Sequence, residues 1–200
     1  MEYKFKKVCI GIDQSYKRTG ITIAGDGVIY KIISLDLSHL ECNTLKRKEI
    51  RYKILEVIEM ALKLSPSVII LTERIRTFSG GFLSTNYIKA TGALIATIVD
   101  AAYDYNLKTY SVDTRAWKAK VVGTAKGSQG NNKMPTVEYV KKLGYEEDIL
   151  IQTKKLNKGG FVKDKKNYVY NDDAADSACI ALYPFKCDKQ ERKEKMKLCE

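Results

Sequence analysis

Short apolar runs that each end at an acidic residue are the feature that most constrains the fold of this chain. Residues 8–12 are followed by Asp13, and residues 68–72 end beside Glu73. Runs of this length, rich in valine and isoleucine, predict buried β-strands. Because an unpaired buried charge is very costly, acids at the ends of buried elements need partners. The pattern therefore predicts two central strands whose ends carry carboxylates toward a cationic partner.

A second pair of acids opens a helix-like stretch near the end of the chain. Asp173 and Asp176 stand three residues apart, so a helix over 172–183 would present both on one face. The helix dipole also favours ionised carboxylates there, with Asp172 expected as the N-cap. Oxygen-only ligands suit hard ions, which predicts Mg²⁺, with Mn²⁺ as a substitute, rather than zinc.

The composition limits the protein class. Two hundred residues with 44% hydrophobic content are enough for one domain with a real core. The 35 Lys and Arg residues outnumber 24 Asp and Glu, so the formal net charge is +11. A positive field of this kind attracts phosphate backbones, although a merely soluble, lysine-rich protein would share it. Acids that hold a metal inside a basic shell favour cleavage of a polyanion, most plausibly nucleic acid.

Several other classes of protein are disfavoured. The single histidine, His39, lies in a polar stretch, and the chain has no G-x-S-x-G motif, which argues against a serine hydrolase. The five cysteines are odd in number and show no C-x-x-C spacing, so we expect a reducing compartment and no zinc knuckle. The chain also shows no signal-peptide pattern and no apolar run that could span a bilayer. We therefore expect a cytoplasmic protein.

The periodicity of the chain predicts a mixed sheet with helices on its faces. The expected strands lie at 6–13, 19–24, 28–35, 68–72 and 108–112, and the expected helices at 44–64, 85–105, 114–121, 135–143 and 172–183. Gly25-Asp26-Gly27 predicts a hairpin turn between the second and third strands. Residues 150–170 fit a basic hairpin or a mobile loop equally well, and the charged end of the chain is expected to be frayed or solvated.

Five segments, spread over most of residues 7–183, match one known family. They are Gly11-Ile12-Asp13 with the following Thr19-Gly20, Ile70-Leu71-Thr72-Glu73, Thr91-Gly92-Ala93-Leu94-Ile95-Ala96, Trp117-Lys118-Ala119-Lys120-Val121-Val122-Gly123, and Asp173-Ala-Ala-Asp176. Together they resemble the RuvC family of Holliday-junction resolvases, within the RNase H-like (retroviral integrase) superfamily. One departure is Gln14-Ser15, where the family usually has Pro-Gly.

The resemblance implies a fold, an activity and an assembly. It implies an α/β, RNase H-like domain over residues 1–184, with a mixed five-stranded sheet and helices on both faces, followed by a charged tail at 185–200. The implied activity is metal-dependent, paired phosphodiester hydrolysis in four-way and other branched DNA. Two Mg²⁺ ions per site would be held by Asp13, Glu73, Asp173 and Asp176. Helix 85–105 would form a homodimer through Gly92, Ala93 and Ala96.

The same resemblance implies DNA contacts in two further places. It assigns contacts with the junction backbone or the reacting phosphate to basic residues in and after the segment at 117–123: Lys118, Lys120, Lys126 and Lys133. The family also places an aromatic residue after the second acid, where it stacks on junction bases. Phe78 is the candidate here, with Phe82 as its competitor.

Three alternatives stay open at the level of sequence. A Gly-Ile-Asp strand followed by a hairpin also opens actin-like sugar kinases, but these need a second glycine-rich phosphate loop that this chain lacks. Another RNase H-like nuclease, acting on RNA–DNA hybrids or flaps, would share the four acids. A non-catalytic junction-binding module is the third, although a pure binder of DNA would do better with lysines at those positions.

Overall fold

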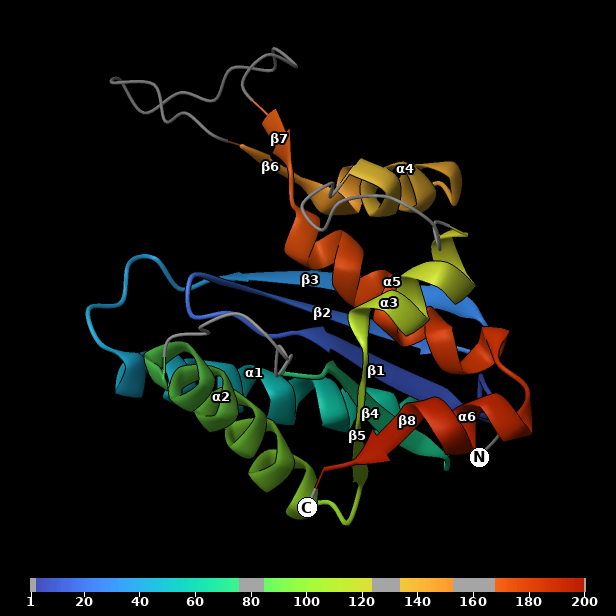
Figure 1. Cartoon of the computed structure of the whole chain (residues 1–200), viewed down its shortest axis with the longest axis horizontal. Coiled ribbons are helices and arrows are strands. Elements are labelled where there is room, and N and C mark those ends of the chain that lie inside the picture. Colours follow the sequence, from blue (N-terminus) through green and yellow to red (C-terminus); the bar gives the residue numbers. More distant parts are fainter. Residues whose placement is uncertain (1–2, 76–84, 124–133, 153–167, 200) are drawn as a thin grey trace.

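A six-stranded mixed sheet lies at the centre of the molecule (Figure 1). The computed structural model describes residues 3–75, 85–123, 134–152 and 168–199. The strand order is β3-β2-β1-β4-β5-β8, with bounds β1 (Val8–Asp13), β2 (Arg18–Gly25), β3 (Val28–Asp36), β4 (Val68–Glu73), β5 (Lys108–Val112) and β8 (Met196–Leu198). Strands β1, β4 and β5 are parallel, and the other three pair antiparallel. The expected α/β class is confirmed, with one strand more than predicted.

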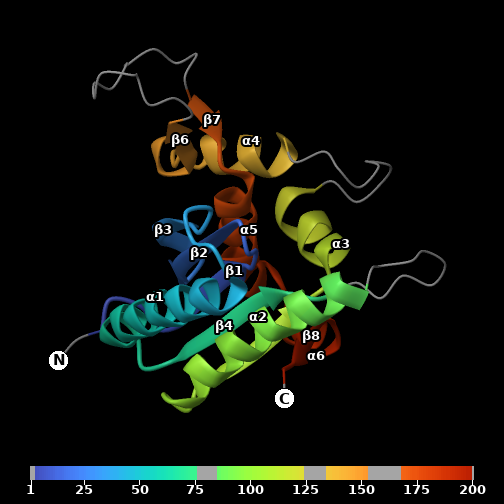
Figure 2. The same ribbon diagram turned by 90° about the vertical axis from the view of Figure 1, so that its left-hand side faces the viewer.

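Helices cover both faces of this sheet (Figure 2). One face packs against α1 (Asn43–Leu64) and α2 (Thr85–Tyr103), whose buried residues form one core with the even-numbered residues of β1. The other face packs against α5 (Asp172–Lys186), with α3 (Thr114–Trp117), the π-helical turn η1 (Lys118–Val122) and α4 (Met134–Lys142) beside it. The sheet therefore separates two cores, as the predicted helices on both faces require.

The hairpin between β2 and β3 forms at the predicted turn. Asp26 and Gly27 both have positive φ, at 49° and 88°, as a two-residue type I′ turn requires. The carboxylate of Asp26 accepts hydrogen bonds from the backbone N–H groups of Lys6 and Lys7 at 2.9 and 3.0 Å. The turn therefore also anchors the start of the chain beside the sheet.

Helix α5 lies directly on the backbones of β1 and β2. A Cβ atom at Gly11 would come within 2.3 Å of the Ala181 backbone nitrogen and 2.4 Å of the Ser177 carbonyl oxygen. A Cβ atom at Gly20 would come within 2.0 Å of the Asp173 carbonyl oxygen. All three distances are shorter than atoms can tolerate, so only glycine permits this approach at the two positions.

The end of the chain differs from the sequence prediction. Helix α5 continues through Pro184 to Lys186, and residues expected to be a frayed or solvated end form α6 (Lys189–Lys195) and β8. Asp188 and Glu191 form a capping box that starts α6. Strand β8 pairs with β5, which protects the otherwise open edge of the sheet. The sequence did not predict these two elements. Helix α6 consists almost entirely of charged residues, and β8 has only three residues, which is too few to show a periodic pattern.

Two smaller differences concern the region before α5. The N-cap of this helix is Asn171, whose side-chain oxygen accepts a hydrogen bond from the Ala174 N–H at 3.2 Å, so the assignment of Asp172 as N-cap was wrong. The short helix η2 (Glu147–Ile149) leads into β6 (Leu150–Gln152), which pairs antiparallel with β7 (Tyr168–Tyr170). A hairpin base is thus present within 150–170, and residues 153–167 lie outside the described residues.

Two properties expected from the composition can be stated for the described ranges. None of the helices there is long and apolar enough to cross a membrane. The five cysteines are all free thiols: Cys9, Cys42, Cys179, Cys187 and Cys199.

The contact between α5 and the sheet predicts a strong effect of Gly20→Ala. The added methyl group meets backbone atoms, which cannot move aside as a flexible side chain does. We expect a loss of at least about 3 kcal/mol in the free energy of unfolding, the upper end of the usual overpacking range. Urea denaturation measures this value.

Gly144→Ala is the matched control for this substitution. It adds the same methyl group at a turn with nothing within 4 Å, and its φ of 89° is the only source of strain. The control should cost about 1–2 kcal/mol. Equal losses in the two variants would show that α5 can lift from β2 at little cost.

Candidate active site

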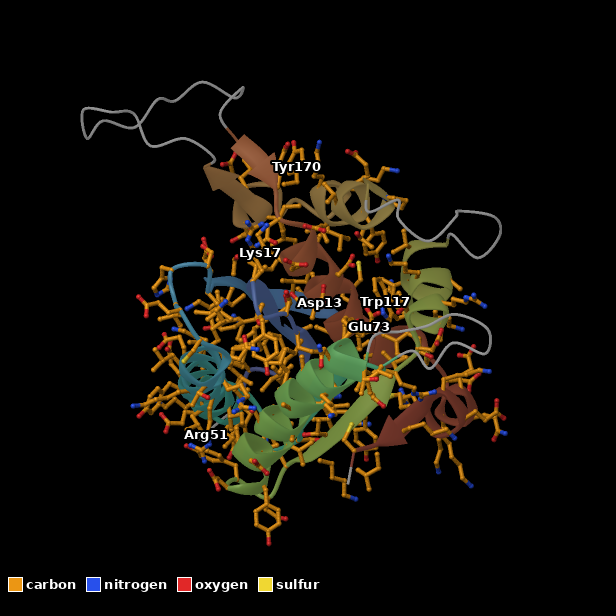
Figure 3. The ribbon with its side chains drawn as sticks, turned by 60° about the vertical axis from the view of Figure 1, so that its left-hand side comes forward. Asp13, Lys17, Arg51, Glu73, Trp117 and Tyr170 are labelled. Atoms are coloured by element: carbon orange, nitrogen blue, oxygen red, sulfur yellow. The ribbon has the colours of Figure 1, made fainter. Side chains whose placement is uncertain are left out.

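Asp13 and Glu73 lie on the same face of the sheet at the ends of neighbouring strands. Side chains alternate along a strand, so Asp13 shares the face of Cys9, and Glu73 shares the face of Leu71. Cys9 and Leu71 both belong to the core beneath α5. The parallel register of β1 and β4 brings the ends of the two strands together. Both carboxylates are therefore at the α5 side of one sheet edge, where Figure 3 shows them close to each other.

The third and fourth acids reach this edge through α5. Gly20 is the cross-strand partner of Asp13, and Gly20 also abuts the backbone of Asp173. Asp173 is therefore fixed one strand away from Asp13, although the two residues are far apart in sequence. Asp176 lies one helical turn further on, with 7% of its surface exposed. The structure thus brings all four predicted acids to one region, from two strands and one helix.

Neighbouring polar groups hold Glu73 and the end of β4 in place. The hydroxyl of Thr114, at the start of α3, donates a hydrogen bond to Glu73 Oε1. The side-chain amide of Gln14 donates to the Glu73 carbonyl oxygen at 2.9 Å, and the Thr72 hydroxyl donates to Gln14 Oε1. Gln14 therefore ties the end of β1 to the end of β4. Sequence reasoning missed Thr114 and noticed Gln14 only as a departure from the family pattern.

Lys118 supplies positive charge next to Asp176. Its Nζ lies 3.9 Å from Asp176 Oδ2 and 5.1 Å from the centroid of the Trp117 ring. Trp117 is fully buried, so the packed indole fixes the start of η1. Burial, and secondarily the negative charge of Asp176, raise the pKa of the nearby Cys179 thiol. Cys179 therefore stays neutral, which leaves the carboxylates as the anionic groups at this edge.

The donor set fits a hard divalent cation in its chemistry, because all the candidate ligand atoms are carboxylate oxygens. Across the described ranges, however, no three His, Cys, Asp or Glu residues are arranged as a group that could hold a metal ion. Glu73 is engaged by Thr114, and Asp176 by Lys118. A carboxylate has two oxygens and accepts a hydrogen bond while it coordinates an ion, so these contacts are compatible with ion binding. The placement of the ligands on neighbouring elements fits a divalent cation.

The predicted DNA-contacting residues divide into two groups. Lys118 and Lys120 lie on η1, where Lys118 faces Asp176, while Lys120 Nζ donates to Glu191 Oε1 of α6 at 2.7 Å. The other predicted contacts, and the competing aromatic residue, lie outside the described residues: Phe78, Phe82, Lys126 and Lys133. The contact of Lys120 with Glu191 was not foreseen, because the end of the chain was expected to be solvated.

Comparison with solved structures shows that this fold is known. Thermus thermophilus RuvC in complex with Holliday junction substrate matches with a TM-score of 0.62 and 15% sequence identity, over 96% of this chain and 99% of that one. A further Thermus thermophilus RuvC structure matches at 0.58, with 16% identity over 96% and 99% of the two chains. The yeast mitochondrial Holliday junction resolvase Ydc2 matches at 0.57, with 18% identity over 96% and 83%.

At these identities, the similarity establishes a shared fold. The chain has the RuvC-like form of the RNase H-like fold, as the sequence resemblance implied. No protein-family model and no curated protein matches the sequence.

The link between α6 and η1 predicts an effect of Glu191→Gln on the start of η1. The hydrogen bond between the two side chains lowers the pKa of Glu191 and raises that of Lys120. The pair is therefore charged across the neutral range, and is lost as the pH falls through the lowered pKa of Glu191 or rises through the raised pKa of Lys120. At neutral pH, removing the charge of Glu191 should loosen residues 118–122 and shift the fluorescence of Trp117, the single tryptophan, to longer wavelength.

Hydrogen exchange of residues 118–122, together with the tryptophan emission, measures this effect. Glu194→Gln is the matched control, because Glu194 lies on the same helix and bonds with Gln190 instead of η1. Faster exchange in both variants would show that α6 as a whole has been disturbed. No change in either would show that the ion pair does not support η1.

Proposed function

We propose that this protein is a metal-dependent, structure-selective endodeoxyribonuclease that resolves four-way DNA junctions by paired phosphodiester hydrolysis. The observation that carries the proposal is the convergence of Asp13, Glu73, Asp173 and Asp176 at one edge of the sheet, from β1, β4 and α5. Isolated acids at strand ends and helix starts have ordinary structural uses. Four of them at one edge of a chain with a net charge of +11 have a better explanation in cation-assisted phosphate chemistry.

The four carboxylates would hold Mg²⁺, or Mn²⁺ in its place, with two ions per site. When bound, such ions would supply activation of a water molecule and stabilisation of the leaving oxygen of a phosphodiester. The residues of the chain itself supply the positioning. Thr114 and Gln14 orient Glu73 and its backbone, while the glycine contact at Gly20 fixes the start of α5 relative to β1.

Lys118 has a second role in this proposal. Its ammonium group lies 3.9 Å from Asp176 Oδ2, so it would also lie beside a substrate phosphate bound at the acids, where it could contact a phosphate oxygen. Its position over the buried Trp117 ring limits where the ammonium group can move.

The choice of branched DNA rests on the solved structures of similar fold. Two of them are named as Holliday junction proteins, one in complex with its junction substrate. Residues 1–184 would form the nuclease domain, with α6 and β8 as its C-terminal extension. Free thiols are typical of proteins in a reducing compartment, so the cytoplasm stays the predicted location. A nuclease for RNA–DNA hybrids or flaps would use the same acids, and the substrate comparison below separates the two.

A homodimer would explain the selectivity for junctions. Two identical sites related by a twofold axis can engage two symmetric strands at once, which raises avidity by about 10²–10⁴ where the geometry allows it. The buried residues of α2 face the sheet, and Gly92 and Ala96, four residues apart, lie together on another face of this helix. Ala96 is exposed and Gly92 is half-buried, so a partner helix could approach closely there.

Replacing single ligands tests the nuclease mechanism. Asp13→Asn, Glu73→Gln, Asp173→Asn and Asp176→Asn keep the shape of each side chain and remove its charge. We expect cleavage of a four-way junction in Mg²⁺ to fall by several orders of magnitude, while junction binding persists or tightens because phosphate repulsion decreases. Gel assays with a four-way junction, a flap, a linear duplex and an RNA–DNA hybrid, with and without Mg²⁺, measure both properties.

Asp100→Asn is the matched control, because Asp100 is an exposed carboxylate of α2 outside the acidic edge. It should cleave like the wild type. Full activity of Asp13→Asn in Mg²⁺ would refute the metal mechanism. If the wild type cuts the RNA–DNA hybrid or the flap in preference to the junction, the protein is a nuclease for that alternative substrate and the junction proposal is wrong.

The dimer is tested by Ala93→Arg, which introduces a charge into the predicted interface on α2. We expect a monomer with a reduced preference for junctions over duplex DNA at the same salt concentration. Val28→Arg, at a 58% exposed position of β3 outside α2, is the control and should remain a dimer. Sedimentation analysis measures the state of each variant. If the Ala93→Arg variant is still a dimer, the interface does not lie at this position of α2. If the wild type is a monomer and still makes paired cuts, junction resolution does not require a dimer.

A further inference from the structure

The opening turns of α1 extend beyond the core of the protein. The helix begins at Asn43, but its first buried residue is Ile50. From Ile50 onward, the helix packs on the sheet through a regular series of buried side chains, ending at Ala61. Residues 43–49 therefore gain little from burial. Most of the stability of a helix in a protein comes from such packing, so this extension calls for another explanation.

Three consecutive cations lie on this extension: Lys46, Arg47 and Lys48. The only acid beside them is Glu49, and the first turn of the helix contains no acidic residue. Cations near the start of a helix are opposed by the helix dipole. Further along, Arg51 pairs with Asp104 and Lys53 pairs with Glu56. None of the three cations at 46–48 forms an ion pair with another residue of the described ranges.

The extension lies at the same end of the sheet as the acidic edge. Strand β1 ends at Asp13, and the turn that follows is joined to the connection before α1 by a hydrogen bond from Leu37 N–H to the Lys17 carbonyl oxygen, at 3.0 Å. Figure 1 shows the start of α1 and the β1–β2 turn at one end of the molecule, and Figure 2 views that end directly. Lys17, which is exposed, lies on the turn between the acids and α1.

An aromatic side chain completes this surface. Tyr52 is 57% exposed, and Lys48 Nζ lies 5.8 Å from the centroid of its ring. The residues on either side of Tyr52 are paired with acids. Arg51 pairs with Asp104, which follows α2, and Lys53 pairs with Glu56 of the same helix. The ion pairs of Arg51 and Lys53 give these two cations a role in the folded structure. In the part of the chain that the structure describes, Lys46, Arg47 and Lys48 have no such role.

We propose that Lys46, Arg47 and Lys48 form a backbone-binding surface for a duplex arm of the DNA substrate as it leaves the acidic edge. This inference rests on the proposed function and adds a contact region that neither the four acids nor η1 supplies. Consecutive helix residues point in different directions, so two of the three side chains at a time can reach one DNA backbone. Such contacts would fix the direction of the arm without reading its sequence, since contacts to phosphates carry no base information. An anionic membrane surface shares the negative charge but lacks the narrow, regular phosphate spacing that a single short helix segment can follow.

The test compares K46A/R47A/K48A with the matched control K4A/K6A/K7A. The control removes three positive charges from exposed positions just before β1. These residues lie at the opposite end of β1 from Asp13, because the strand begins at Val8 and ends at Asp13. Binding to a duplex and to a four-way junction is measured by fluorescence anisotropy over a salt series in metal-free buffer, and thermal melting verifies that each variant is folded.

We expect the slope of log K against log[salt] to shrink by about one to two units in the α1 variant, because each lost phosphate contact contributes roughly 0.9. The control should keep a slope close to that of the wild type. Equal slopes in the α1 variant and the wild type would overturn the inference, as would an equal decrease in both variants. An α1 variant that loses binding to phosphatidylserine vesicles but keeps its DNA slope would also overturn it.

The proposed function is assessed in the same experiment by adding Mg²⁺ to the wild type. If the wild type cuts no junction, the nuclease proposal fails, while the salt slopes still decide whether α1 binds DNA. If the wild type cuts junctions and the slopes are equal, the inference on α1 fails alone.

Discussion

The absence of side chains at Gly11 and Gly20 lets α5 rest on the backbones of β1 and β2, and the rest of the candidate site depends on this contact. The hydroxyls of Thr22 and Ser177 share a buried hydrogen bond of 2.8 Å in the same layer, which fixes the helix along its axis. Because Gly20 is paired with Asp13 and touches Asp173, one contact sets the relation between an acid on a strand and an acid on a helix. Catalytic geometry of this kind needs support that cannot yield, and contact between two backbones provides it.

Four acidic side chains lie in one region at the acidic edge, and repulsion between their charges would lower the stability of the fold. Like charges at short range destabilise each other, and the structure limits this repulsion with Thr114 beside Glu73 and Lys118 beside Asp176. Under the proposed function, a divalent cation would offset more of this negative charge than the two polar groups do. The basic remainder of the chain then attracts the polyanion whose backbone the edge would cleave.

The sequence predicted most of the fold because local signals were strong there. Runs of valine and isoleucine predicted the central strands, and Gly25-Asp26-Gly27 predicted a turn that needs positive φ at two residues. The four acids were found because each follows or opens an apolar run. Apart from the N-cap of α5, the missed features depend on contacts between distant residues. Nothing near Thr114 in sequence indicates Glu73, nothing near Lys120 indicates Glu191, and β8 is a strand only because β5 offers it an edge.

The C-terminal segment contacts the surroundings of the acids at two places. Arg74, next to Glu73, donates from its guanidinium to the Lys195 carbonyl oxygen at 3.1 Å and to the Ser111 carbonyl oxygen at 3.3 Å. On the other side, Glu191 holds Lys120 of η1, the turn that also presents Lys118 to Asp176. Residues of α6 and β8 thus contact the neighbours of an acid on β4 and of the cation beside α5. A stretch that looks like a solvated tail by its charge therefore acts as a brace. Two of its charged residues are engaged inside the structure: Glu191 accepts from Lys120, and Arg192 donates to the carbonyl oxygens of Pro184 and Cys187.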